Sequence, residues 1–389
     1  MDDMRMLMDA LPKPPDFAYD WSALGRSALG RWLDKLAQVR QNPVWHGEGD
    51  VLTHTRMVCE RLCENPAFRA LNAQRRQAIA LAALLHDVGK IPATKLEDGQ
   101  WVSPGHGGVG ARMAREILWK HFGMSGTPQA IRMRETVCSL IRHHMLPEHL
   151  LDRENPELLL CEIAADAALT ELFSVDLLCM LAQADVLGRI ADDTAELCQM
   201  VELSRQAAQE AGCLHGPIHF LDAYTQRAYF QGRKVWNGQA LFNDTWGEVI
   251  LLSGLPGTGK DTWIARCGGG LPVVSLDALR IQMGVDPTDA QGEVGQAAQE
   301  QARVYLRAKQ PFIWNATNLT EAMRQKLVGL FEGYGAAVHI VYLETQWEEN
   351  LRRNAQRSAR VPESVIEGML GKMVLPRRRE AQSVEWICV

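Results

Sequence analysis

One short stretch of the chain carries the residues of a phosphate-binding loop. The segment GLPGTGKDT follows the apolar run VILLS and matches G-x-x-x-x-G-K, the P-loop pattern. In a P-loop, backbone amides at a helix N-terminus and the lysine hold the phosphates of a nucleoside triphosphate. We therefore expect ATP, or another nucleoside triphosphate, with Mg²⁺. The expected binding residues are Gly254, Leu255, Pro256, Gly257, Thr258, Gly259, Lys260, Asp261 and Thr262.

The P-loop departs from its pattern at one position. Asp261 follows the lysine, where a serine or threonine hydroxyl normally helps to hold Mg²⁺, and Thr262 is displaced by one position. A carboxylate is a good ligand for a hard cation. We interpret Asp261 as a metal ligand, at the cost of an added negative charge near the phosphates.

Further polar residues follow the P-loop at the ends of apolar runs. Asp277 and Arg280 come directly after PVVSL, and Asn315 ends FIWN. Open α/β sheets bind ligands at the carboxyl ends of their strands. A carboxylate there can accept the proton of an attacking hydroxyl, and an arginine can bind an anionic acceptor. Arg353 and Arg357 are four residues apart on one helical face, so both can reach a γ-phosphate.

A second set of residues lies about 170 positions upstream and has the composition of a metal site. His86 and Asp87 are adjacent in LLHDVGK, and Lys90 follows one turn later. Imidazole and carboxylate together suit Mn, Fe, Co, Ni or Zn. Six ligands exceed the needs of one ion, so we expect two, which can bind a phosphate and generate a hydroxide. Lys90 can hold a phosphate oxygen. The other candidate ligands are His54, His106, His143 or His144, and Asp185.

Two regions with different hydrophobic periods must position these residues. Residues 1–230 repeat apolar positions every three or four residues, which predicts a helical domain. Residues 231–246 are interrupted by Gly, Asn and Asp and are interpreted as a linker. In residues 247–389 the short apolar runs VILLSG, PVVSL, FIWNAT and AVHIVYLE alternate with helical stretches, which predicts an α/β domain with a parallel sheet. The expected fold is multidomain: all-α, then α/β.

The composition limits the classes of protein that the chain can belong to. It has 389 residues, 23% of them charged, and a net charge of −6, so bulk electrostatic binding of nucleic acid is not expected. Nine cysteines without a C-x-x-C pair indicate reduced thiols. The N-terminus lacks a signal pattern, and the longest apolar run is too short to span a bilayer. We expect a cytoplasmic protein without membrane contact; a homodimer is expected only because most soluble oligomers are symmetric dimers.

The order H…HD…H…H…D, with HDVGK at its centre, resembles the HD phosphohydrolase superfamily over roughly residues 46–192. The resemblance implies that His54, His86, Asp87 and Asp185 bind a first metal ion. It implies that His106 and His144 complete a second site, and it leaves His143 as the alternative to His144.

The order GLPGTGK…DALR…NATN…RNAQR…VP resembles the kinase domain of phage polynucleotide 5′-kinase and its bacterial relatives, over nearly all of residues 247–376. The resemblance implies that Asp277 is the general base acting on a polynucleotide 5′-OH. It also implies that Arg280 contacts the phosphate flanking that end, and that Arg353 and Arg357 stabilise the transition state.

The two halves in this order resemble the bacterial HD-Pnk RNA end-repair enzymes. The resemblance implies removal of 2′- and 3′-phosphates, or opening of 2′,3′-cyclic phosphates, by the first half, and phosphorylation of 5′-OH ends by the second. The implied partners are RNA ends, with DNA left open, and an RNA ligase acting afterwards. Two alternatives remain: a nucleotide phosphohydrolase fused to a small-molecule kinase, and an ATP-gated RNA-binding sensor with an inactive helical half.

Overall fold

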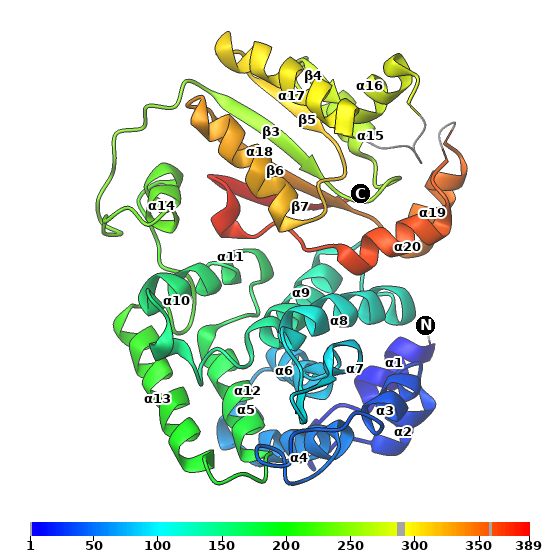
Figure 1. Cartoon of the computed structure of the whole chain (residues 1–389), viewed down its shortest axis with the longest axis vertical. Helices are drawn as coiled ribbons and strands as arrows, with labels where there is room; N and C mark the ends of the chain where they lie inside the picture. The colour runs from blue at the N-terminus through cyan, green and yellow to red at the C-terminus, as the bar shows by residue number, and fades with distance from the viewer. Residues whose placement is uncertain (1, 286–291, 358–359) are drawn as a thin grey trace. The chain divides into compact units, whose positions relative to one another are not determined.

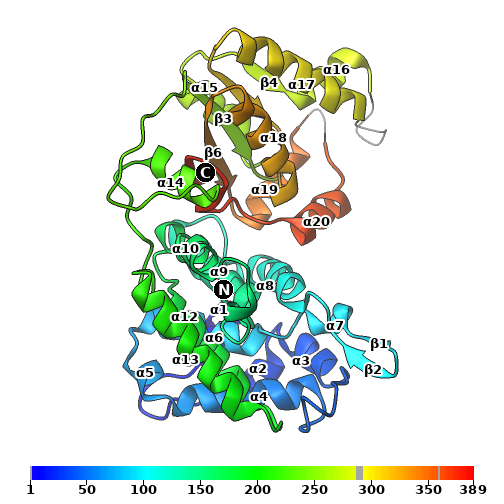
Figure 2. The same cartoon turned by 60° about the vertical axis from the view of Figure 1, so that its left-hand side comes forward.

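The computed structural model describes residues 2–285, 292–357 and 360–389. The chain divides into two compact units, Met1–Ile218 and His219–Val389 (Figures 1 and 2). The division precedes the expected linker at residues 231–246. Helix α14 (Ala223–Phe230) belongs to the second unit, where Arg227 Nε donates to Glu332 Oε1 over 2.7 Å. The sequence places this helix in the first domain because its period is helical, and the period does not show which unit it packs on.

The first unit is almost wholly helical, as the sequence predicts. A small hairpin, β1 (Lys95–Glu97) with β2 (Gln100–Val102), is its sheet structure among the described residues. The helices are α1 (Asp2–Asp9), α2 (Trp21–Arg26), α3 (Gly30–Leu36), α4 (Val51–Glu64), α5 (Pro66–Ala70), α6 (Ala73–Leu85), α7 (Lys90–Ala93), α8 (His106–Phe122), α9 (Pro128–His143), η1 (Leu150–Asp152), α10 (Pro156–Ala164), α11 (Ala167–Thr170), α12 (Val175–Leu187) and α13 (Thr194–Glu210).

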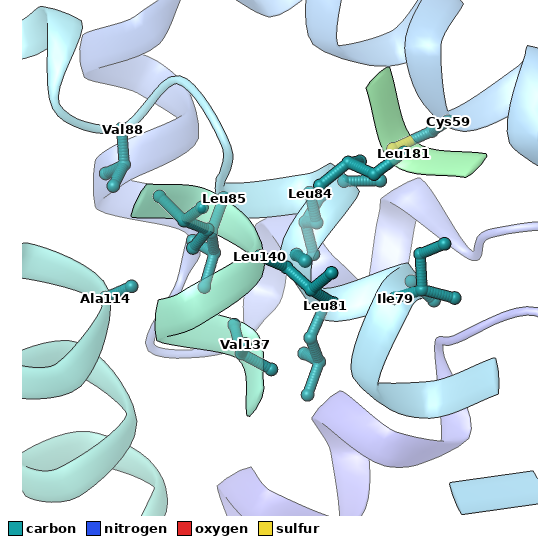
Figure 3. Packing of buried hydrophobic residues seen from close by; sticks show 14 of the residues in the cluster. Cys59, Ile79, Leu81, Leu84, Leu85, Val88, Ala114, Val137, Leu140 and Leu181 are labelled. Carbon is teal, nitrogen blue, oxygen red and sulfur yellow. The ribbon is translucent and has the colours of Figure 1, made fainter. Parts of the chain in front are cut away.

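Helix α6 forms the centre of the core in this unit. Residues 78–85, AIALAALL, are all buried, so the last two turns of this helix are apolar on every side. Figure 3 shows Leu81 and Leu85 of α6 near Val137 and Leu140 of α9, within one cluster of buried side chains. Helices α4 and α12 also pack against α6. The last residue of α6, Leu85, is therefore held in place by packing. His86 and Asp87 follow it directly and are held in place with it.

The second unit contains a five-stranded sheet in which every paired strand is parallel, with the order β4-β5-β3-β6-β7. The sequence analysis identifies the first four strands but misses β7, a half-exposed edge strand without a long apolar run. The elements are β3 (Glu248–Ser253), α15 (Lys260–Cys267), β4 (Val273–Ser275), α16 (Leu276–Met283), α17 (Gly292–Arg307), β5 (Phe312–Asn315), α18 (Glu321–Gly333), β6 (Ala337–Glu344), α19 (Trp347–Ala355), α20 (Glu363–Lys372), η2 (Arg378–Glu380) and β7 (Ser383–Cys388).

The structure also shows the state of the cysteines and the character of the longer helices. All nine cysteines lie among the described residues and are free thiols, and most of them are buried. Among the described residues, no helix combines the length and apolar character that crossing a bilayer requires.

A buried ion-pair network joins α8 to α9. Arg115 Nη2 donates to Glu135 Oε2 over 2.6 Å, and Arg134 Nε donates to Glu135 Oε1 over 2.8 Å. Burial by itself raises the pKa of Glu135, but the two guanidiniums outweigh burial and lower it from 4.5 to about 2. The Arg134 guanidinium also lies 4.1 Å from the centre of the Trp119 ring. The carboxylate form of Glu135 is therefore the form that the fold stabilises.

This network predicts a pH-dependent contribution to stability. Because the folded pKa of Glu135 is depressed, its contribution is present above pH 4.5 and is lost as the pH falls towards about 2. We expect Glu135→Gln to lower the unfolding free energy at pH 7 by about 3 kcal/mol, and the difference from wild type to shrink below pH 4. Urea unfolding read by hydrogen exchange of α8 and α9 peptides measures this.

The matched control is Glu171→Gln, which removes an exposed ion pair with Arg132. Its expected cost is below about 1 kcal/mol. Equal effects of the two substitutions would contradict the role given to Glu135.

Candidate functional site

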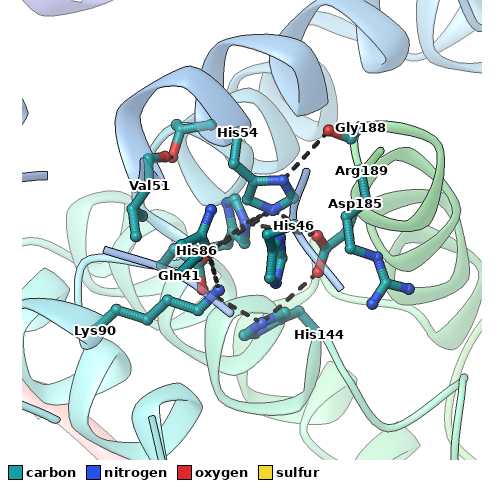
Figure 4. Close-up of polar contacts among 12 residues, drawn as sticks. Gln41, His46, Val51, His54, His86, Lys90, His144, Asp185, Gly188 and Arg189 are labelled. Carbon is teal, nitrogen blue, oxygen red and sulfur yellow. Dashed lines mark hydrogen bonds and ion pairs between the residues drawn. The ribbon is translucent and has the colours of Figure 1, made fainter. Parts of the chain in front are cut away.

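Five helix ends meet in the first unit, and each places a candidate metal ligand there. The start of α4 is fixed by Asp50, whose Oδ1 accepts a hydrogen bond from the Thr53 amide over 2.9 Å. Figure 4 shows side chains from these ends pointing toward one another. The ligands are His54 in the first turn of α4, His86 and Asp87 directly after α6, His106 at the start of α8, His144 directly after α9, and Asp185 in the last turn of α12.

The Asp87 carboxylate joins two groups of imidazoles. Its Oδ2 lies 3.3 Å from His86 Nε2, which is itself 3.3 Å from His54 Nε2. Its Oδ1 lies 3.3 Å from His106 Nε2, which is 3.3 Å from His144 Nε2. Each oxygen of this carboxylate thus lies beside one group of imidazoles. In this position the carboxylate could bridge two neighbouring ions.

Asp185 repeats this arrangement from α12. Its Oδ1 lies 2.9 Å from His54 Nε2, and its Oδ2 lies 3.8 Å from His144 Nε2. The sequence leaves His143 and His144 open as alternatives; His144 is the one that lies in the ligand groups, with its side chain buried. His143 is the last residue of α9 and is outside those groups.

The hydrogen bonds of the imidazoles favour a cation between them. In His86, His106 and His144, Nδ1 donates to a backbone carbonyl within 3 Å, which leaves the lone pair on Nε2. Two such lone pairs 3.3 Å apart repel each other unless a cation lies between them. The buried Oδ1 of Asp87 also accepts no hydrogen bond from the described residues. Imidazole nitrogens and carboxylate oxygens together are ligands that suit divalent transition metals. The three carbonyls belong to Ala83 for His86 (2.8 Å), Ser103 for His106 (2.9 Å) and Ile141 for His144 (2.7 Å).

The pKa shifts of the histidines agree with this interpretation. Burial lowers the pKa of His144 to about 4, and burial also lowers the pKa of His106, so both rings are neutral at pH 7. For His54, burial is outweighed by hydrogen bonds with Asp185 and Glu48, which raise its pKa to about 9. A divalent ion carries charge of the same sign as this proton and can take its place.

Glu48 is a site residue that the sequence analysis misses. Its Oε1 lies 2.8 Å from His46 Nδ1 and 3.1 Å from His54 Nδ1, and its Oε2 accepts from the Ile190 amide over 3.0 Å. Burial opposes ionisation, but hydrogen bonds from His46 and His54 hold the pKa of Glu48 well below its usual range. A carboxylate in this position fixes the tautomer and orientation of a metal-binding histidine. Nothing in the spacing of WHGEGD distinguishes it from a surface glutamate.

Two cations flank the ligand groups. Lys90 Nζ lies 2.8 Å from Asp87 Oδ2 and donates to Gln41 Oε1 over 2.8 Å. Arg189 follows Asp185 by one turn and lies near it in Figure 4. Its Nη2 lies 3.3 Å from Glu148 Oε2. Lys90 was expected from the sequence, whereas Gln41 and Arg189 were not. Positive groups on both sides of the carboxylates suit a site that binds phosphate.

In the second unit the P-loop connects β3 to α15. Gly254, Gly257 and Gly259 have φ angles of 145°, 86° and 89°, which residues other than glycine rarely adopt. A Cβ on Gly254 would also lie 2.5 Å from the carbonyl oxygen of Leu343. Lys260 Nζ donates to the Gly254 and Leu255 carbonyls, each over 2.9 Å. The loop thus has the backbone conformation that phosphate binding needs.

Burial and the nearby Arg357 guanidinium lower the pKa of Lys260 to about 8. A bound phosphate would supply the negative charge that keeps this ammonium protonated.

Asp261 has a specific partner at the end of β5. Asn315 Nδ2 donates to Asp261 Oδ1 over 2.7 Å, and Asn315 is buried. P-loop enzymes commonly hold Mg²⁺ with a loop hydroxyl and a strand-end aspartate. Here the carboxylate is in the loop and the neutral side chain is at the strand end. Both residues fit a hard cation, because an oxygen of Asp261 remains outside this hydrogen bond.

Asp277 lies between two arginines beside the P-loop edge of the sheet. Its Oδ1 lies 2.5 Å from Arg280 Nη1 and its Oδ2 lies 3.1 Å from Arg357 Nη2. Burial raises the pKa of Asp277, but these two guanidiniums outweigh burial and lower it. The carboxylate is thus ionised at neutral pH. Arg353 Nη1 lies 3.5 Å from the position that a Cβ on Gly259 would occupy, and its Nε donates to Glu349.

Comparison with known proteins agrees with this geometry. An HD domain model matches residues 51–169, and an AAA domain model matches residues 249–376. The chain therefore combines an HD domain and a P-loop kinase-like domain in one polypeptide. The first match ends before Asp185, a ligand expected from the sequence, which the structure places beside His54. The second match includes the P-loop, Asp277, Arg353 and Arg357.

The position of Glu48 leads to a prediction about metal affinity. Glu48→Ala removes the nearer of two acceptors of the His54 Nδ1 proton and leaves the Gly188 carbonyl at 3.3 Å, so we expect divalent metal affinity to fall about 10–100-fold. Competition with a fluorescent chelator for Mn²⁺ or Zn²⁺ measures it. The control is Glu60→Ala on the exposed face of α4. Equal affinities for the two variants would rule out this role for Glu48.

Proposed function

We propose that the chain repairs both ends of broken RNA. The HD domain removes 2′- and 3′-phosphates or opens 2′,3′-cyclic phosphates, and the P-loop domain transfers phosphate from ATP to 5′-OH ends. The observation that carries the proposal is the double use of Asp87 by two ligand groups, in a chain that also holds Asp277 and two arginines beside a P-loop. Ribonuclease cleavage leaves a 2′,3′-cyclic phosphate and a 5′-OH, and such a chain would treat both.

In the HD domain the residues divide into metal ligands and phosphate ligands. His54, His86, Asp87 and Asp185 would hold one ion, and His106 and His144 would complete the second site with the same carboxylates. Mn, Fe, Co, Ni or Zn bound there would supply a hydroxide at neutral pH. Lys90 and Arg189 would bind phosphate oxygens from opposite sides and orient the ester for attack.

In the P-loop domain each polar group has a separate role. The loop amides and Lys260 would bind the β- and γ-phosphates, and Asp261, held by Asn315, would be a ligand of Mg²⁺. Asp277 would accept the proton of the 5′-OH as it attacks. Arg280 would hold the phosphate that flanks this end. Arg353 and Arg357 would neutralise charge on the transferred phosphoryl group.

A second function is supported by the same domains at a coarser level. An HD phosphohydrolase fused to a P-loop kinase can also act on nucleotides and on a small molecule. Arg280, which is the arginine assigned to the acceptor, favours an acceptor that carries a phosphate over a small neutral one. The proposed partner downstream is a ligase that joins 3′-OH and 5′-phosphate ends.

The proposal predicts separable effects on the two ends of one RNA. With an oligonucleotide bearing a 5′-OH and a 2′,3′-cyclic phosphate, we expect Asp87→Ala to abolish healing of the 3′ end only. We expect Lys260→Ala to abolish phosphorylation of the 5′ end only. Gel analysis of both ends, with ATP and Mg²⁺, Mn²⁺, Ni²⁺ or Co²⁺ in turn, measures this.

Consumption of free nucleotides with no change at either RNA end would support the metabolic alternative instead. A wild-type protein that binds RNA in an ATP-dependent manner without altering either end would support the sensor alternative.

The role of Asp277 predicts a specific kinetic defect. Asp277→Asn keeps the shape of the side chain but removes the proton acceptor, so we expect the 5′-kinase kcat to fall about 10²–10⁴-fold. ATP affinity, measured by calorimetry, should change little. Glu300→Gln on α17 removes an exposed ion pair and should leave both quantities unchanged. Lost ATP binding with an unchanged kcat would show that Asp277 only organises the arginines.

A further inference from the structure

His46 borders the ligand groups, and its two ring nitrogens differ in their contacts. Its Nδ1 lies 2.8 Å from Glu48 Oε1, and its Nε2 makes no hydrogen bond with the described residues. The ring meets the His54 ring edge-on, with centroids 4.9 Å apart. Its side chain is 15% exposed, so it can still be reached from solvent. Figure 4 shows His46 among the residues of the ligand groups.

Glu48 decides which kind of group His46 can bind. Because the carboxylate only accepts hydrogen bonds, the neutral His46 ring carries its proton on Nδ1. Nε2 is consequently an acceptor. The same Glu48 oxygen lies 3.1 Å from His54 Nδ1, so one oxygen atom faces the Nδ1 proton of both rings. A metal ion between these three residues would have to displace both protons.

An acceptor at this place has few partners in the proposed substrate. Phosphate oxygens at pH 8 have no proton to donate, and Lys90 and Arg189 already offer them donors. The nearest donor to a terminal 3′-phosphate is the hydroxyl on the neighbouring ribose carbon. The 2′-OH is the group that distinguishes RNA from DNA.

We propose that His46 Nε2 accepts a hydrogen bond from the ribose hydroxyl next to the scissile phosphate, which makes the HD domain selective for RNA ends over DNA ends. This inference rests on the proposed function and adds a residue that determines its specificity. A site built to bond a hydroxyl rejects the analogue that lacks it, because a polar atom is left unpaired. For one neutral hydrogen bond the expected preference is about tenfold.

The test uses two oligonucleotides that differ in one atom. Both end in a 3′-phosphate, and the terminal sugar is ribose in one and 2′-deoxyribose in the other. Phosphate release with Mn²⁺ gives kcat/KM for each. For wild type we expect the ribose end to react about tenfold faster. For His46→Ala the ribose end should fall to the rate of the deoxyribose end, which itself changes little.

Two further variants separate recognition from structure. His46→Gln places an amide oxygen at a similar reach and should retain part of the preference. Gln41→Ala removes the buried amide that bonds Lys90, and should slow both substrates equally because both carry the phosphate. Metal content, measured by mass spectrometry, should be the same for wild type and His46→Ala.

The inference is overturned if His46→Ala slows both substrates equally, if it loses metal, or if Gln41→Ala erases the preference in the same way. Equal wild-type rates on the two ends would overturn the role of His46 alone and leave the proposed function standing. No phosphate release from either end would overturn the proposed function together with this inference.

Discussion

The ligand groups of the HD domain depend on the burial of helix α6, because two of their residues follow this apolar helix directly. Residues 78–85 of α6 are all buried, and each buried leucine there contributes about 1.5–3 kcal/mol to folding. His86 and Asp87 follow directly, so they are held where α4, α9 and α12 pack on α6. Hydrophobic burial thus fixes a group of lone pairs and carboxylate oxygens that would otherwise separate.

The orientation of these groups comes from a second layer of hydrogen bonds. Backbone carbonyls lie within hydrogen-bond distance of Nδ1 in four of the imidazoles, and one Glu48 oxygen contacts both His54 and His46. Glu48 Oε2 also accepts from the Ile190 amide, which ties the loop before α4 to the end of α12. The ligands therefore arrive with their nitrogen lone pairs already directed inward, and little reordering is left for metal binding.

In the P-loop domain, a parallel sheet brings the polar residues of the candidate site together. Parallel strands end at one edge, so β3, β4 and β5 bring the loop, Asp277 and Asn315 together although they are far apart in sequence. The hydrogen bond between Asn315 and Asp261 explains how a P-loop can carry an unusual carboxylate: its partner is a neutral amide rather than a second acid. Two negative groups at this distance would repel each other and the phosphates.

The sequence by itself determined that a helical region is followed by an α/β region, and it carries the local patterns of both candidate sites. HDVGK, the P-loop and the change from a period of 3.6 to short apolar runs are local patterns, so they can be found without a fold. The tertiary structure decided what depends on packing. It placed His144, and not His143, within the ligand groups, assigned α14 to the second unit, and added β7 to the sheet edge. It also brought Glu48 to His54 and Asn315 to Asp261, because the distance between residues on separate elements is set by how those elements pack and not by their spacing in the chain.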